Sequence, residues 1–134
     1  MDAIRTPHRQ EADRPIAFVF EKRPRWAPEL ERQFANEDAR VVSCRSLHDV
    51  VDRSAAARCG VVVIDIAVDT ADCLRFLGRR LGNPPALPVI VVAQGQTAMF
   101  EWPVRDLGAC AFLAKRIPGH EMADLCRRQW STSL

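Results

Sequence analysis

The sequence predicts an α/β fold in which five parallel strands form one doubly wound sheet with helices on both faces, a three-layer (βα)5 sandwich. The first observation is a set of short segments that are apolar at nearly every position, which is typical of strands buried on both faces. The second is that each of these segments precedes a stretch with apolar residues at helical spacing. Because the connections are short, the parallel strands are expected to be joined right-handedly through the helices.

Bulk composition indicates one globular domain. The chain has 134 residues, 48% hydrophobic and 27% charged, which is enough to bury a core without disulfides or metals. A net charge of +2 does not predict a nucleic-acid or membrane partner. No apolar run of membrane-spanning length and no signal-peptide pattern is found, so we expect a cytoplasmic protein. Residues 1–14 are almost free of apolar side chains and are predicted to be a disordered lead-in to a domain at 15–134.

The predicted strands are bounded by turn residues and charged clusters. Gly60 turns the chain into the most apolar of them, a run of four branched residues that ends on Asp65. A charged cluster follows the first strand, and Lys115 follows the last. The five predicted strands are Ile16–Phe20, Arg40–Cys44, Gly60–Asp65, Leu87–Ala93 and Cys110–Ala114.

The first two helices are predicted from proline, spacing and capping. Pro28 suits the first turn of a helix, and Leu30 and Phe34 lie four residues apart on one face. Ser46 is a plausible N-cap, with Asp49 three residues on in the position of a capping-box acid. These patterns predict helices over 27–36 and 47–57.

Periodicity also predicts the remaining helices. The third carries apolar residues at helical spacing and is ended by the Gly-Asn-Pro-Pro sequence at 82–85. The fourth covers 97–107, where Pro103 should shorten or kink it. Pro118 opens the last. The apolar stripes are Leu74, Leu77 and Leu81 in the third helix, and Met122 and Leu125 with Gln129 in the last.

The five cysteines are predicted to be reduced core residues. Their number is odd, no two form a C-x-x-C pair, and several lie in apolar segments. His48 and His120 are too isolated to complete a metal site with them. The cysteines are Cys44, Cys59, Cys73, Cys110 and Cys126.

Polar residues follow four of the strands at the carboxyl edge of the predicted sheet, where α/β proteins place their ligands. They are Glu21, Asp65, Gln94 after Ala93, and Lys115. The two acids could hold Mg²⁺ and the lysine could contact a phosphate. The alternatives are a structural ion pair between Lys115 and Asp65 with Glu21 solvated, or an aspartate that simply starts the next loop.

At this point the sequence resembles a known family, the receiver domains of response regulators in two-component signalling (the CheY-like superfamily). Residues 108–115, Gly-Ala-Cys-Ala-Phe-Leu-Ala-Lys, resemble the "GADDYLxKP" ending of these domains. Residues 61–65, followed by 72–74, resemble the phosphoacceptor strand and its later "DG-L" step. Residues 87–93 resemble the "PVIxLTA" strand, and the matching intervals cover 16–130.

The resemblance implies roles for several residues. It places Asp65 at the phosphoacceptor position, where Glu21 and Asp65 would hold Mg²⁺, and Lys115 at the phosphoryl contact. The switch positions would be Ala93 and Phe112. It also implies a face for partner contacts formed by the fourth helix, the fifth strand and the fifth helix. On or near this face would lie Met99, Phe100, Trp102 and Trp130, with the alternative that they are core residues or cap a helix end.

Departures from the family pattern lie at the same positions. The acidic pair after the first strand is Phe20-Glu21, which leaves one carboxylate, and Ala93 offers no switch hydroxyl. Arg116 replaces the proline after the lysine, and Asp69 the proline after the acceptor. Mg²⁺ demands near-ideal octahedral oxygen ligation, so its affinity should be weak or lost.

These observations lead to two hypotheses about function. The first is a degenerate receiver, not an enzyme, that acts as a protein-interaction module for a histidine kinase, an output protein or a second copy of itself. The second is a working phospho-accepting receiver that uses Asp65 with Mg²⁺. A nucleotide binder of flavodoxin-like fold is disfavoured because no glycine-rich loop follows the first strand. A DNA-binding output role is also disfavoured, since no helix-turn-helix pattern is present.

Overall fold

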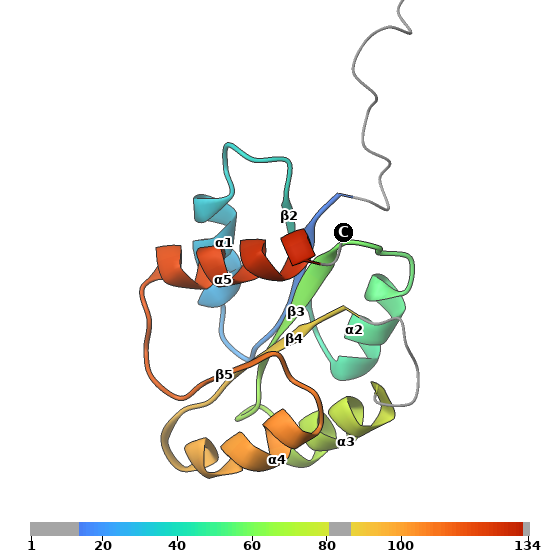
Figure 1. Ribbon diagram of the computed structural model, residues 1–134, viewed down its shortest axis with the longest axis vertical. Helices are drawn as coiled ribbons and strands as arrows, with labels where there is room; N and C mark the ends of the chain where they lie inside the picture. Colours follow the sequence, from blue (N-terminus) through green and yellow to red (C-terminus); the bar gives the residue numbers. More distant parts are fainter. Residues whose placement is uncertain (1–13, 81–86, 133–134) are drawn as a thin grey trace, which may run out of the picture.

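A computed structural model describes residues 14–80 and 87–132. Strands and helices alternate along the chain, in the order predicted from the sequence (Figure 1). The strands are β1 (Ile16–Phe20), β2 (Arg40–Cys44), β3 (Gly60–Asp65), β4 (Val89–Val92) and β5 (Ala111–Leu113). The helices are α1 (Trp26–Gln33), α2 (Leu47–Ser54), α3 (Thr70–Arg80), the 3₁₀ segment η3 (Gly95–Phe100), α4 (Glu101–Asp106) and α5 (Gly119–Thr132).

The five strands form one sheet in the order β2-β1-β3-β4-β5, and every pair is parallel. Every residue of β1 and β4 is buried, as is every residue of β3 except the last. The edge strands β2 and β5 are partly exposed. The doubly wound (βα)5 fold predicted from the continuous apolar runs is therefore confirmed.

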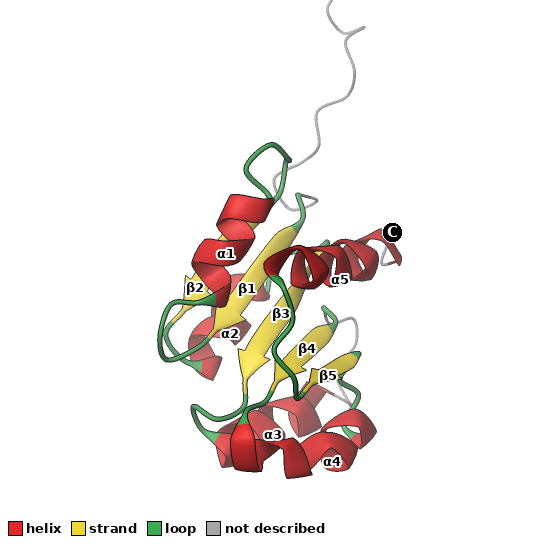
Figure 2. Ribbon diagram, turned by 90° about the vertical axis from the view of Figure 1, so that its left-hand side faces the viewer, coloured by secondary structure: helices red, strands yellow, loops and turns green. Residues whose placement is uncertain are grey.

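The helices divide between the two faces of the sheet (Figure 2). Alternate residues of β1 and β3 point to opposite sides, so each strand contributes to two apolar layers. One layer packs under α1 and α5, and the other under α2, α3 and α4. The side chains that these helices bury include Leu30, Met122 and Cys126 in the first layer, and Val50, Phe76, Leu77 and Val104 in the second.

Gly60 is required at the entry to β3. Its φ of 153° lies in the region that side-chain-bearing residues rarely adopt. A Cβ atom built there would lie 2.2 Å from the carbonyl oxygen of Ile16 on the neighbouring strand. The glycine therefore allows β3 to enter the sheet beside β1.

The helix predicted over 97–107 is wrong in its first half. The chain forms a 3₁₀ segment up to Phe100, and the α-helix begins at Glu101. Pro103 occupies the third position of α4, where a missing N–H removes no intrahelical hydrogen bond. The proline thus accounts for a short helix that begins close before it.

The buried stripe of α5 differs from the predicted one. Met122, Cys126 and Trp130, four residues apart, face the sheet and α1, while Leu125 and Gln129 are only partly buried. Trp130 is 7% exposed, and its ring centroid lies 5.2 Å from that of Phe34. The prediction that Trp130 belongs to an exposed contact face is therefore wrong, because its ring fills the space between α5 and α1.

Some predictions lie outside the described residues. They are the disordered lead-in, of which residues 1–13 are not described, and the helix end at 81–85. Arg14, the first described residue, pairs with Asp38 at 2.8 Å. Within the described ranges, no helix combines the length and the apolar character needed to cross a bilayer.

Four of the five cysteines are buried, as predicted, whereas Cys110 is exposed. Burial raises the pKa of Cys44 to about 11, and it raises the pKa of both Cys73 and Cys126 to about 12. These thiols stay protonated and act as small apolar groups in the two core layers.

We predict that the fold loses stability at alkaline pH through its buried thiols. Because the folded pKa of Cys73 and Cys126 lies above the unfolded value, their contribution is complete below about pH 8.5 and is lost as the pH rises towards about 12. At about pH 10, each of these two thiols should lower the free energy of unfolding by about 1 to 2 kcal/mol relative to neutral pH. Urea unfolding in a reductant, at a series of pH values, measures this loss.

Few other side chains titrate in this alkaline range, since the chain has no tyrosine and its lysines are Lys22 and Lys115. Cys126→Ala should lower stability at neutral pH but flatten the alkaline decline, while Ser43→Ala, which removes an exposed hydroxyl and no thiol, should leave the decline unchanged. An equal alkaline slope in Cys126→Ala and the parent protein would contradict the assignment.

Candidate functional site

The strand register brings the predicted site residues to one edge of the sheet. Phe20 of β1 is paired with Ile64 of β3, so Glu21 lies level with Asp65. Asp65 is in turn paired with Val92 of β4, and Val92 with Leu113 of β5. The residues that follow these strands, Ala93 and Lys115 among them, therefore emerge at the same carboxyl edge.

Glu21 is bonded to the N-terminus of α1. Its two carboxylate oxygens accept hydrogen bonds from the backbone N–H groups of Arg25, Trp26 and Ala27, at 3.1, 3.0 and 3.0 Å. These amides belong to the first turn, where N–H groups have no partner within the helix and attract negative charge. The carboxylate thus substitutes for a side-chain cap, which residue Arg25 does not supply.

Asp65 organises the loop between β3 and α3. One of its carboxylate oxygens accepts a hydrogen bond from the backbone N–H of Ala67 at 3.0 Å. Four residues later, Asp69 caps α3, since its Oδ1 accepts from the N–H of Asp72 at 3.0 Å. Asp69 is therefore used as a helix cap, and Asp65 has the loop-starting hydrogen bond that the sequence left as an alternative.

Lys115 lines a basic cavity that neither Glu21 nor Asp65 lines. The cavity has a volume of about 340 Å³, and its charged lining consists of Arg25, Lys115 and Arg116, with no carboxylate among the described lining residues. Within the described chain, Lys115 forms no ion pair with Asp65, so the structural ion pair considered from the sequence is absent. The cavity is suited to an anion rather than a cation.

The two switch positions are both buried. Ala93 is 3% exposed and Phe112 is 6% exposed, and both belong to the core layer under α2, α3 and α4. The nearest described hydroxyl in sequence, that of Thr97, bonds the N–H and the carbonyl oxygen of Gln94 at 2.8 and 2.6 Å. The Thr97 hydroxyl therefore caps η3. Because residue 93 is an alanine, it offers no hydroxyl that could link Asp65 to the Phe112 ring.

The residues at this edge do not fit a Mg²⁺ site. Both oxygens of Glu21 accept backbone hydrogen bonds, and Phe20, in place of a second acid, is packed into the core at 6% exposure. Among the described residues, no group of three or more His, Cys, Asp and Glu side chains is placed to hold a metal ion. Of the four carboxylate oxygens of Glu21 and Asp65, only Oδ2 of Asp65 accepts no hydrogen bond from the described residues, which is a poor donor set for Mg²⁺.

Sequence reasoning missed Arg25 and Trp26 as members of the site. The guanidinium of Arg25 lies 4.7 Å from the centroid of the Trp26 ring, and both residues line the cavity with Lys115. The sequence signal that could have found them is the adjacent Arg-Trp pair in the basic loop after the first strand. The sequence does not show that this pair lies beside Lys115, because that position depends on the N-terminus of α1, which Glu21 caps.

Comparison with known proteins identifies the fold. No protein-family model and no curated protein sequence matches the chain. Solved structures do match. A response regulator from Thermotoga maritima is 12% identical with a TM-score of 0.71, over 87% of this chain and 98% of that one.

Two further solved structures agree with it. A response regulator receiver protein from Pseudoalteromonas atlantica is 14% identical with a TM-score of 0.70, over 90% of this chain and 100% of that one. The inactive form of the regulatory domain of the repressor of iron transport regulator is 12% identical with a TM-score of 0.65, over 82% and 89%. The chain has the CheY-like receiver fold, as the resemblance implied.

We predict that Glu21 contributes to stability through its three amide contacts. Glu21→Ala should lower the free energy of unfolding by about 1 to 3 kcal/mol, because it leaves donors of the first turn of α1 unpaired. Urea unfolding measures the difference. Glu31→Ala, an exposed acid on the same helix, should change stability by less than about 0.5 kcal/mol. Equal effects of the two substitutions would show that the capping contacts contribute nothing.

Proposed function

We propose that this chain is an atypical receiver domain, a signalling module rather than an enzyme, that acts in the cytoplasm by binding proteins. In this proposal Asp65 takes up a phosphoryl group weakly or not at all. The observation that carries the proposal is that both oxygens of the Glu21 carboxylate accept hydrogen bonds from three backbone amides of α1, so neither is left free for a metal ion.

Charge explains why this matters for phosphoryl transfer. Transfer to a carboxylate relies on positioning and on positive charge that stabilises the transferring group, much of it supplied by a metal ion. Here one acid is replaced by the buried Phe20 and the other caps a helix. Lys115 and Arg116 supply positive charge, but they lie in a cavity that Asp65 does not line.

In this proposal, transmission of a signal from a phosphorylated Asp65 to the Phe112 ring is weakened as well, for a separate reason. A modification acts as a switch only if it biases an element that has two arrangements. Position 93 offers no hydroxyl to follow a phosphoryl oxygen, and the hydroxyl of Thr97 is committed to capping η3. A charge added at Asp65 would therefore find no hydroxyl at position 93 whose movement could reposition the ring of Phe112.

The alternative function is a working phosphoacceptor that uses Asp65 with Mg²⁺. Two retained features favour it: Asp65 ends the central strand at the same sheet edge as Lys115, and the side chain of Asp65 is only partly buried. A phosphoryl donor can therefore reach the carboxylate.

Treatment with acetyl phosphate and Mg²⁺ separates the two functions. We expect the intact mass to show no phosphoryl gain beyond that of Asp65→Asn, and EDTA to make no difference. A gain of one phosphoryl group that requires both Asp65 and Mg²⁺ would establish the alternative. Mass spectra taken at short intervals guard against loss of a short-lived acyl phosphate.

The proposed contact surface is centred on Met99 of η3 and Trp102 of α4. These side chains are 75% and 72% exposed, which is unusual for large apolar residues. Phe100, between them, is partly buried and packs against the core beneath. Large exposed apolar and aromatic side chains with a fixed base are typical of interface centres. The partners we propose are a histidine kinase, an output protein or a second copy of this chain.

A second copy is the partner that can be tested directly. We expect sedimentation velocity at rising protein concentration to show a dimer that Trp102→Glu abolishes, because burying a carboxylate in an apolar interface is unfavourable. Val51→Glu, which adds the same charge at another exposed apolar position on α2, should leave the dimer intact. A monomer at every concentration would exclude self-association, and loss in both variants would exclude this surface.

A further inference from the structure

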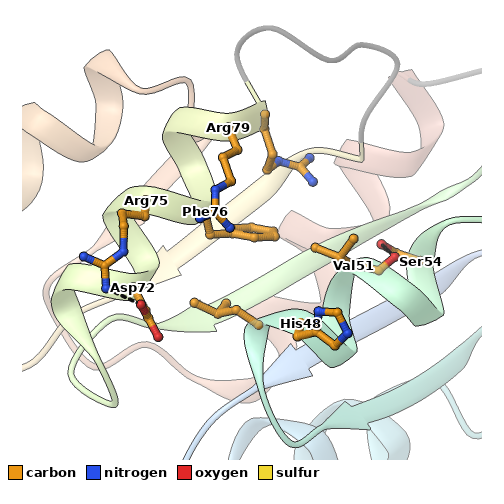
Figure 3. A pocket seen from close by; sticks show the side chains of 9 residues that line it. His48, Val51, Ser54, Asp72, Arg75, Phe76 and Arg79 are labelled. Carbon is orange, nitrogen blue, oxygen red and sulfur yellow. Dashed lines mark hydrogen bonds and ion pairs between the residues drawn. The ribbon is translucent and has the colours of Figure 1, made fainter.

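A second surface on the molecule has the chemistry of a binding site. A groove of about 530 Å³ lies between α2 and α3, within the size range of ligand pockets. Its lining includes none of Glu21, Asp65 and Lys115, and neither Met99 nor Trp102. Figure 3 shows its lining, with Val51 of α2 and Phe76 of α3 facing the same space. The remaining lining residues are Leu47, His48, Ser54, Asp72, Arg75, Arg79 and Arg80.

The floor of the groove is apolar and partly open. Val51 is 50% exposed, although its neighbour Val50 is fully buried in the core. Leu47, one turn earlier on α2, is partly buried and packs against the same core. Phe76 faces them from α3 and is 6% exposed. Covering apolar surface of this kind with another apolar group lowers the free energy of the system.

Three arginines line the α3 side of the groove, beside this apolar floor. Arg75, Arg79 and Arg80 supply three guanidinium groups, and Asp72 is the one carboxylate among the described lining residues. Asp72 is already paired with Arg75, as the dashed line in Figure 3 shows. On α2, the side chain of His48 pairs with Asp52 at 3.2 Å. The groove therefore carries an excess of positive charge.

The position of the charge is fixed by the fold. The guanidinium of Arg80 lies 5.2 Å from the centroid of the Phe76 ring and donates to the carbonyl oxygen of Leu87. A guanidinium has five N–H donors, so the pairing of Arg75 with Asp72 leaves donors on Arg75 for a second carboxylate. An apolar floor beside oriented arginines matches a ligand that carries both an apolar group and carboxylates.

We propose that the groove between α2 and α3 binds an acidic peptide segment of a partner protein. A large apolar side chain of the segment covers Val51 and Phe76, and flanking aspartates or glutamates pair with Arg75 and Arg79. This interaction needs no phosphorylation of Asp65 and does not involve the surface at Met99 and Trp102, so it stands or falls independently of the proposed function.

A selection experiment tests the proposal without knowledge of the partner. The full chain, immobilised through a tag, is presented with a phage library of random 16-residue peptides. We expect enrichment of peptides that combine several acidic residues with Leu, Phe or Trp. The same selection on Arg75→Glu/Arg79→Glu should not enrich them, because the groove then repels carboxylates.

Affinity measurements on one enriched peptide, labelled with fluorescein, then locate the site. Fluorescence anisotropy should show binding that weakens about tenfold or more in Arg75→Glu/Arg79→Glu and in Val51→Ser. Arg105→Glu, an exposed arginine of α4, should bind like the parent chain. The substituted side chains are exposed, and circular dichroism confirms that each variant is folded.

Several outcomes would overturn the proposal. They are failure to enrich any peptide, enrichment without acidic residues, and equal binding by the parent chain and the double arginine variant. Binding to vesicles of phosphatidylserine through the same arginines, with no peptide enriched, would assign the groove to an anionic membrane surface instead.

Discussion

Burial of β3 on both faces is the constraint on which the rest of the molecule depends. A parallel strand that is apolar up to its last residue must be covered above and below, and it must be flanked by strands that satisfy its backbone groups. The chain meets these needs with β1 and β4 at its sides, α1 and α5 over one face, and α2, α3 and α4 over the other. Gly60 makes the arrangement sterically possible.

The same constraint places the polar residues. Because β3 is central, its last residue, Asp65, emerges between the ends of β1 and β4, at the edge where acids and bases from separate segments meet. What they do there depends on local hydrogen bonds. Glu21 is drawn to the unpaired amides of α1, and Asp65 and Asp69 to amides of the following loop and helix. The acids thus stabilise helix and loop termini, while the cations line a separate cavity.

The proposed function depends on surfaces outside the sheet edge. Helices pack on both faces of the sheet, yet Val51, Met99 and Trp102 remain exposed. They belong to two places of different chemistry, one apolar on η3 and α4, and one framed by arginines between α2 and α3. The proposed function relies on such surfaces, because binding needs complementarity and not phosphoryl chemistry.

The sequence by itself determined the alternation of strands and helices, since apolar runs and helical spacing are local patterns set by burial. It also indicated which residues reach the carboxyl edge. Only the tertiary structure decided what those residues contact. No pattern in the sequence pairs Glu21 with the α1 amides, because that bond depends on the angle at which α1 leaves β1. Likewise, Trp130 looked like an exposed aromatic until Phe34 of a distant segment was placed 5.2 Å from its ring. Local periodicity fixes which elements form, whereas contacts between segments far apart in the chain fix the environment of each side chain.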